Sequence, residues 1–170
     1  MQEEERNRYK ILIDRGNEVF ERLNGHISRL NDRAISLVRL NFLLITFIST
    51  VILYLLDRDW RPSANEEYIL IFTIGLLIIS LVISLFIYKL SPYNEINVFE
   101  EGRFNELMSM SEKRLLSNNL YDIREAYESN VKKYKTRTKG FKFSYYCHII
   151  AVGILIGALI INLLVRGEYV

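Results

Sequence analysis

Residues 68–88 read YILIFTIGLLIISLVISLFIY, a run of aliphatic, aromatic and small residues without a single charge. Residues 40–56 and 143–165 are also free of Asp, Glu, Lys and Arg. As helices, the runs at 40–56, 68–88 and 143–165 span roughly 26, 32 and 35 Å, against a hydrocarbon core of about 30 Å. Because they contain no Pro and lack the alternation of a barrel strand, they predict three transmembrane helices.

The charged residues are concentrated in the rest of the chain. All 22 basic and 20 acidic residues of the 170 lie outside these runs, although the average composition is 50% hydrophobic and 25% charged with a net charge of +2. The first 30 residues contain no apolar stretch of signal-peptide length, so we expect the first span to act as an uncleaved anchor. The sequence therefore predicts an all-α, polytopic membrane protein.

Basic residues near the span ends predict the orientation. Residues 57–67 hold two Lys or Arg residues, whereas residues 1–39 hold eight and residues 89–142 hold eleven. By the positive-inside rule, both basic segments face the cytoplasm, so the N-terminus is expected inside the cell membrane and the C-terminus outside. The predicted segments are a cytoplasmic amphipathic helix (1–34), transmembrane helices (35–56, 68–90, 142–166), an external loop (57–67), a cytoplasmic helical segment (91–141) and an external tail (167–170).

A heptad seam marks the N-terminal segment. Its apolar or small residues are spaced alternately by four and three: Tyr9, Ile13, Gly16, Phe20, Leu23, Ile27, Leu30, Ala34 and Leu37. This spacing predicts one long helix, from about Glu3 into the first span without a break. Its seam needs a partner, either the second cytoplasmic segment or the same helix in another subunit. We expect an oligomerisation seam at Tyr9, Ile13, Phe20, Leu23, Ile27 and Leu30.

The second cytoplasmic segment predicts two further helices. Pro92 ends the second span, and Asn94 or Asn97 is a candidate cap for a short helix reaching Met108. The capping-box spacing at 109–112 is one start signal for a second long helix, and Asn119 with Asp122 is another. That helix is expected to reach the third span, with Gly140 as a candidate kink, and to pack with the N-terminal helix as a coiled bundle.

A basic strip precedes the third span. Its members are Lys132, Lys133, Lys135, Arg137, Lys139 and Lys142, with no acidic residue among them. Beside a bilayer, such charges each gain on the order of 1 kcal/mol from anionic lipid, so the strip and Arg39 are predicted to contact lipid headgroups. A nucleotide-binding or nucleic-acid strip is the alternative. We expect no nucleic acid, because aromatic interleaving is missing and the net charge is nearly neutral.

Motifs of chemistry are missing from the sequence. It contains no phosphate-binding loop, nucleophile elbow or zinc hydrolase pair. Cys147, His148 and His26 lack the spacing of metal ligands, and we interpret Cys147 and His148 as packing residues near a membrane interface. We therefore expect no enzyme, no metal and no cofactor.

Small and weakly polar residues within the spans favour close helix packing. Gly153 and Gly157 form a G-x-x-x-G arrangement, whose contacts lie either within one subunit or between subunits. The first span carries Asn41, Thr46, Ser49 and Thr50, which are candidates for lining a narrow pore in an assembly.

This arrangement resembles the small helical membrane effectors of prokaryotic antiphage systems, namely SLATT-type proteins and the transmembrane effectors of Pycsar and CBASS. The resemblance is carried by Asp32-Arg33-Ala34 before the first span, the hairpin of spans, and Asn130 with the strip 132–142 before the last span. It implies oligomerisation, a response to an infection signal, and damage to the inner membrane by pore formation, in antiviral defence.

Three hypotheses for function follow. The leading one is a homo-oligomeric pore-forming or membrane-disrupting protein controlled by its cytoplasmic helical bundle. The second is a non-conducting adaptor that docks a soluble cytoplasmic partner at the membrane. The third is a small channel or transporter subunit that needs another chain.

Overall fold

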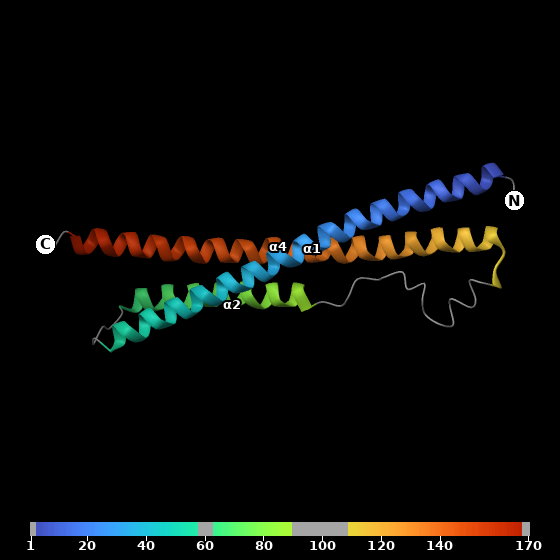
Figure 1. The fold of residues 1–170 in the computed structure, drawn as a ribbon. Coiled ribbons are helices and arrows are strands. Elements are labelled where there is room, and N and C mark those ends of the chain that lie inside the picture. The colour runs from blue at the N-terminus through green and yellow to red at the C-terminus, as the bar shows by residue number, and fades with distance from the viewer. Residues whose placement is uncertain (1–2, 58–62, 90–108, 168–170) are drawn as a thin grey trace. The chain divides into compact units, whose positions relative to one another are not determined.

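The computed structural model describes residues 3–57, 63–89 and 109–167, and the regular structure in these residues is entirely helical. It consists of α1 (Glu3–Leu56), α2 (Ala64–Lys89) and α4 (Glu112–Gly167), as Figure 1 shows. Each of these helices contains a stretch long and apolar enough to cross a membrane. The predicted all-α class is thereby confirmed for the described residues, and the three candidate membrane-spanning helices fit the three predicted spans.

Helix α1 is one unbroken helix of 54 residues, as the heptad spacing predicts. Its first turn carries Glu3, Glu4 and Glu5, whose negative charges stabilise the positive N-terminal end of the helix dipole. No Pro interrupts the helix, which ends at Leu56 with a last backbone hydrogen bond from Asp57 to Leu53.

Helix α2 begins with a reciprocal capping box. The Ser63 backbone N–H donates to Glu66 Oε2 at 2.8 Å, and the Glu66 N–H points back to Ser63 Oγ at 3.4 Å. This arrangement satisfies backbone donors that would otherwise lack a partner at the helix start. The helix therefore extends about one turn before the predicted span at residue 68.

Helix α4 confirms the second long helix, but its start differs from the predicted capping box at 109–112, because Ser109 is itself helical and Ser111 directly precedes the first residue of α4. It begins at Glu112, directly after Ser111, whose carbonyl accepts the first-turn N–H of Leu115 at 2.9 Å. Asn119 and Asp122, the other predicted start signal, lie inside the helix. The helix continues through Gly140, where a β-carbon would meet Ile87 of α2 at 3.4 Å. The missing side chain of Gly140 thus lets α2 approach closely.

Several predictions lie outside the described residues. They concern the short helix between Asn94 and Met108, most of the loop 57–67, and the tail after Gly167.

The chain divides into two compact units, of which unit 1 comprises residues 1–30 and 91–136 and unit 2 comprises residues 31–90 and 137–170. In unit 1 the heptad seam of α1 meets α4 of the same chain. A β-carbon on Gly16 would lie 3.0 Å from Ile123 Cγ2, and the rings of His26 and Tyr134 are 6.4 Å apart. The seam residues Leu23, Ile27 and Leu30 are buried. Of the two partners predicted for the seam, the structure contains the one within the chain.

Two ion pairs join the first turns of α1 and α4 in unit 1. Arg6 Nε lies 2.6 Å from Glu112, and Lys113 Nζ lies 2.7 Å from Glu5. The contacts of α1 and α4 advance in the same direction along both helices in this unit, so the two helices run parallel. Because at least two-fifths of each of these four side chains is exposed, the pairs add little stability and mainly fix the register.

In unit 2, α1 and α4 pack with α2 around an apolar centre. Ile48, Leu77 and Ala151, one from each helix, form this buried layer. From one contact between the helices to the next, the residue numbers rise on α1 and α4 and fall on α2. Helix α2 therefore runs antiparallel to both. This is the topology that three successive spans require.

Candidate functional site: a buried polar cluster in unit 2

Five buried polar side chains meet among the three helices of unit 2. They are Asn41 from α1, Ser80 and Ser84 from α2, and Ser144 and His148 from α4, each at most 8% exposed. The two residues from α2 are four apart, and so are the two from α4, so each pair projects from one face of its helix. We call this set the polar cluster.

Asn41 of α1 forms hydrogen bonds with both α2 and α4. Its Nδ2 donates to Ser80 Oγ at 2.7 Å, and its Oδ1 lies 2.7 Å from His148 Nδ1. Since an amide oxygen only accepts, His148 Nδ1 is the donor and carries a proton. Both ends of the amide are therefore satisfied by side chains far away in the sequence.

The serines complete the polar cluster through the backbone. Ser80 Oγ donates to the Ser144 carbonyl at 2.9 Å, and Ser144 Oγ donates to the Ser80 carbonyl at 2.7 Å. Ser84 Oγ lies 2.7 Å from Ser144 Oγ. Because the single hydroxyl proton of Ser144 is already donated to the Ser80 carbonyl, Ser84 is the donor in this pair. The reciprocal bonds bring the α2 and α4 backbones close together, which only small side chains allow.

The polar cluster lies between apolar layers. The buried layer of Ile48, Leu77 and Ala151 is on one side, and the contact of Gly140 with Ile87 is on the other. Its hydrogen bonds are internal, so its chemistry is that of a structural connection among three spans. His148 bonds to an amide and not to a serine hydroxyl, so the cluster does not form a nucleophile–base pair.

The structure separates the candidate pore-lining residues into two groups. Asn41 is fully buried in the polar cluster. Thr46, Ser49 and Thr50 are exposed together on another face of α1, and the Thr46 and Thr50 hydroxyls donate to the carbonyls of Phe42 and Thr46 at 2.9 Å. We call Thr46, Ser49 and Thr50 the hydroxyl face.

The glycine pair of α4 lies on an open side of unit 2. Among the described residues, nothing lies within 4 Å of a β-carbon built on Gly153 or on Gly157. Contacts that need these glycines within one subunit are therefore not made by the described part of the chain.

The basic strip is not uniformly exposed. Lys132, Lys135, Lys139 and Lys142 are exposed, as is Arg39 on α1, and Lys133 is partly exposed. Arg137 is only 5% exposed, so its side chain is shielded by protein. The predicted headgroup contacts thus concern surface cations in every case except Arg137.

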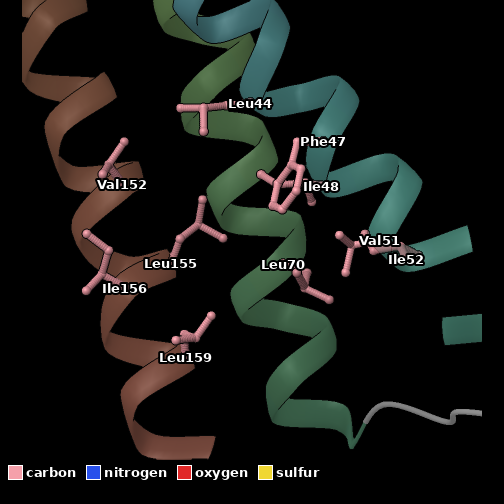
Figure 2. A pocket seen from close by; sticks show the side chains of 10 residues that line it. All are labelled: Leu44, Phe47, Ile48, Val51, Ile52, Leu70, Val152, Leu155, Ile156 and Leu159. Atoms are coloured by element: carbon pink, nitrogen blue, oxygen red, sulfur yellow. The ribbon is translucent and has the colours of Figure 1, made fainter. Parts of the chain in front are cut away.

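An apolar groove of about 370 Å³ opens between the three helices of unit 2 (Figure 2). All of its lining side chains are hydrocarbon: Leu44, Phe47, Ile48, Val51, Ile52, Leu70, Val152, Leu155, Ile156 and Leu159. Such a lining offers no ligand to a hydrated ion. Likewise, the described residues contain no group of three His, Cys, Asp or Glu side chains suited to a metal.

Part of the polar cluster was visible in the sequence as isolated residues. Asn41, His148 and the serines of 68–88 stand out in apolar runs, but Ser144 at the edge of the third run does not. The signal that identifies Ser144 is its four-residue spacing to His148, which matches the spacing of Ser80 and Ser84.

Comparison of the chain with protein-family models, curated proteins and solved structures found no match.

Proposed function

We propose that this protein is a homo-oligomeric membrane effector whose spans assemble into a pore or a membrane-disrupting cluster under the control of unit 1. The observation that carries the proposal is the division of polar groups in the spans. The polar cluster uses its hydrogen bonds within one chain, whereas the hydroxyl face is exposed. A water path along the hydroxyl face therefore needs several copies arranged around it.

Helix continuity supports control by unit 1. α1 and α4 each contribute to both units without a break. In the proposed mechanism, a signal that changes the packing of α1 on α4 in unit 1 changes which span faces are presented to other copies. The cytoplasmic location of unit 1 follows from the positive-inside rule. The resemblance to antiphage effectors supports a prokaryotic inner membrane and an infection signal as the setting.

Dye uptake and membrane potential, measured in cells that express the full chain, test the proposal. The decisive variant replaces Thr46, Ser49 and Thr50 with Leu, which removes the hydroxyl face while the span stays apolar. We expect the wild type to admit dye and this variant to lose most of the uptake. A matched control, Phe42→Leu with Leu43→Ile, changes exposed apolar residues of α1 and is expected to retain uptake. Intact membranes around a demonstrably oligomeric wild type would refute the proposal.

A second candidate function is a non-conducting adaptor, and one observation favours it. In unit 1, Ile11, Leu12 and Val19 are 43–55% exposed on α1, and they lie off the seam that meets α4. Spaced by seven and eight residues, they share one face of the helix and form an apolar patch suited to a helical partner.

The variant Leu12→Asp with Val19→Asp distinguishes the two candidates. If the protein is an adaptor, the variant loses a captured soluble partner and membrane permeability stays at the level of cells without the protein. If the protein is an effector, the variant changes dye uptake. Asp substitutions at Leu23 or Ile27 are unsuitable for this purpose, because those side chains are buried in unit 1 and a charge there disrupts its packing.

A further inference from the structure

A second groove, distinct from the apolar one, lies in unit 2 where α1 and α4 reach their apolar runs. It has a volume of about 440 Å³ and is lined by Arg33, Ser36, Leu37, Leu40, Phe141 and Tyr145. Residues 33–40 precede or begin the first charge-free run, and residues 141–145 bracket the start of the third. The groove therefore lies at the level where a bilayer changes from headgroups to hydrocarbon.

The lining changes from polar to apolar along α1. Arg33 and Ser36 come first, and Leu37 and Leu40 follow about one to two turns later, so the groove extends roughly 10 Å along the helix from the cation to the last leucine. On α4, the rings of Phe141 and Tyr145 stack at 6.2 Å with 18° between their planes and form a flat wall. Tyr is also a residue typical of the membrane interface.

The cation at the polar end is free to bind an anion. Arg33 is exposed, and no carboxylate of the described residues lies within ion-pair distance of its guanidinium. Asp32 precedes it but does not line the groove. A guanidinium binds a phosphodiester through paired N–H donors, and Lys142, next to Phe141, adds positive charge on the α4 side.

We propose that this groove is a binding site for one anionic phospholipid, whose phosphate pairs with Arg33 and whose upper acyl chain lies along Leu37 and Leu40 against the Phe141–Tyr145 wall. The occupant follows from the charge at one end, the hydrocarbon lining at the other, and the position at the edge of two spans. The site is specific, in contrast to the general attraction of the basic strip for a negative surface. The proposal does not depend on pore formation.

A photoactivatable phosphatidylglycerol in phosphatidylcholine nanodiscs tests the site. The full chain is irradiated, and labelled peptides are identified by mass spectrometry. We expect labelling to concentrate at residues 36–40 and 141–145. The variant Arg33→Gln should lower labelling there by about fivefold, because it removes the guanidinium that pairs with the lipid phosphate at this site. A photoactivatable phosphatidylcholine should label the same residues less.

The matched control is Arg39→Gln, which removes an exposed cation of the same helix that does not line the groove. Its labelling should stay within about twofold of the wild type. Equal losses in the two variants would mean that general surface charge recruits the lipid and would overturn the proposal. So would labelling spread evenly along the spans. Competition by soluble inorganic phosphate would instead identify a site for a free anion and would overturn the lipid assignment.

Discussion

Asn41 is the side chain on which two other buried polar groups of the spans depend. Replacing it with Ala leaves Ser80 without its donor and His148 without its acceptor in an apolar surrounding. We expect Asn41→Ala to lower the free energy of unfolding by about 1–2 kcal/mol. Denaturation of the full chain in mild detergent, followed by circular dichroism, measures the change.

The control for this prediction is Thr50→Val. The Thr50 hydroxyl is exposed and donates to the Thr46 carbonyl of its own helix, so its removal leaves no buried partner unsatisfied. The expected change is within about 0.5 kcal/mol. Similar losses in Asn41→Ala and Thr50→Val would contradict the role assigned to the polar cluster.

At the scale of residues, the sequence identifies which polar residues belong to the polar cluster better than which of them form hydrogen bonds with one another. Asn41 stands out as a polar residue in an apolar run, but its partner His148 is 107 residues away. Spacing within one helix says nothing about the register between helices, which depends on how all apolar side chains pack together. The burial of Arg137 could not be predicted for the same reason, since a basic strip beside a membrane ordinarily faces lipid headgroups.

The pairing of α1 with α4 in unit 1 predicts different responses to an added methyl group at two glycines of α1. Gly25→Ala gains helix propensity and meets little more than the end of the flexible Arg29 side chain, so we expect a stabilisation of about 1 kcal/mol. Gly16→Ala gains the same propensity, but its β-carbon would lie 3.0 Å from Ile123 Cγ2. We expect this crowding to cancel most of the gain. Thermal unfolding of the two single variants measures the difference.

A companion variant checks the cause. Ile123→Leu keeps the side-chain volume but moves the branch from Cβ to Cγ and so removes the Cγ2 methyl group beside Gly16, and Gly16→Ala should therefore be better tolerated in that background. If Gly16→Ala stabilises the wild-type chain as much as Gly25→Ala does, α4 does not pack on the seam of α1 at this position.

The ion pairs at the start of unit 1 predict a pH dependence. The hydrogen bond that Lys113 donates to the Glu5 carboxylate holds the pKa of Glu5 below its ordinary value of 4.5 and raises the pKa of Lys113 above its ordinary value of 10.5. The stability that the Glu5 carboxylate adds to the folded chain is therefore present above pH 4.5, and it disappears as the pH falls through the lowered pKa of Glu5. The Lys113 contribution is present below pH 10.5 and disappears as the pH rises through the raised pKa.

Hydrogen exchange in the first turns of α1, corrected for the intrinsic rate, measures this dependence. We expect protection to fall modestly at acid pH, because the side chains are substantially exposed. Glu5→Gln should show a smaller acid response than the wild type. An unchanged acid response in this variant would exclude the Glu5–Lys113 pair as its source.

At the scale of elements, the sequence predicts the long helices well. The seam spacing identifies α1 as one helix, and the signal at 109–112 lies beside the start of α4, although Ser111 and not Ser109 directly precedes its first residue. The predicted span begins at Tyr68, whereas α2 begins at Ala64, because the capping box of Ser63 and Glu66 starts the helix before its first apolar run. Asn119 and Asp122 show the opposite error, since cap-forming residues also occur inside helices.

For the whole molecule, the central prediction is self-association in a membrane. We expect native mass spectrometry of the full chain in nanodiscs to give several copies per particle. The glycine side of α4, open at Gly153 and Gly157, is a packing surface for those copies. Gly153→Leu with Gly157→Leu should therefore reduce the number of copies without lowering the helix content.

A single copy per particle in nanodiscs would contradict the proposed effector, since the seam of α1 already meets α4 within the chain. The adaptor would then be the better account. In that case the exposed Ile11, Leu12 and Val19 patch of unit 1 becomes the expected place of partner binding.

The distribution of the polar cluster over α1, α2 and α4 also has a consequence for biosynthesis. The bond between Asn41 and Ser80 joins the two helices that leave the ribosome first. Ser144 and His148 are translated only later, so until then Ser84 and the amide oxygen of Asn41 lack the partners that they have in the finished fold. A nascent chain that stalls after α2 therefore lacks these hydrogen bonds in an apolar surrounding, which costs free energy. Synthesis of α4 is thus the step that completes the hydrogen bonds of Asn41 and Ser84.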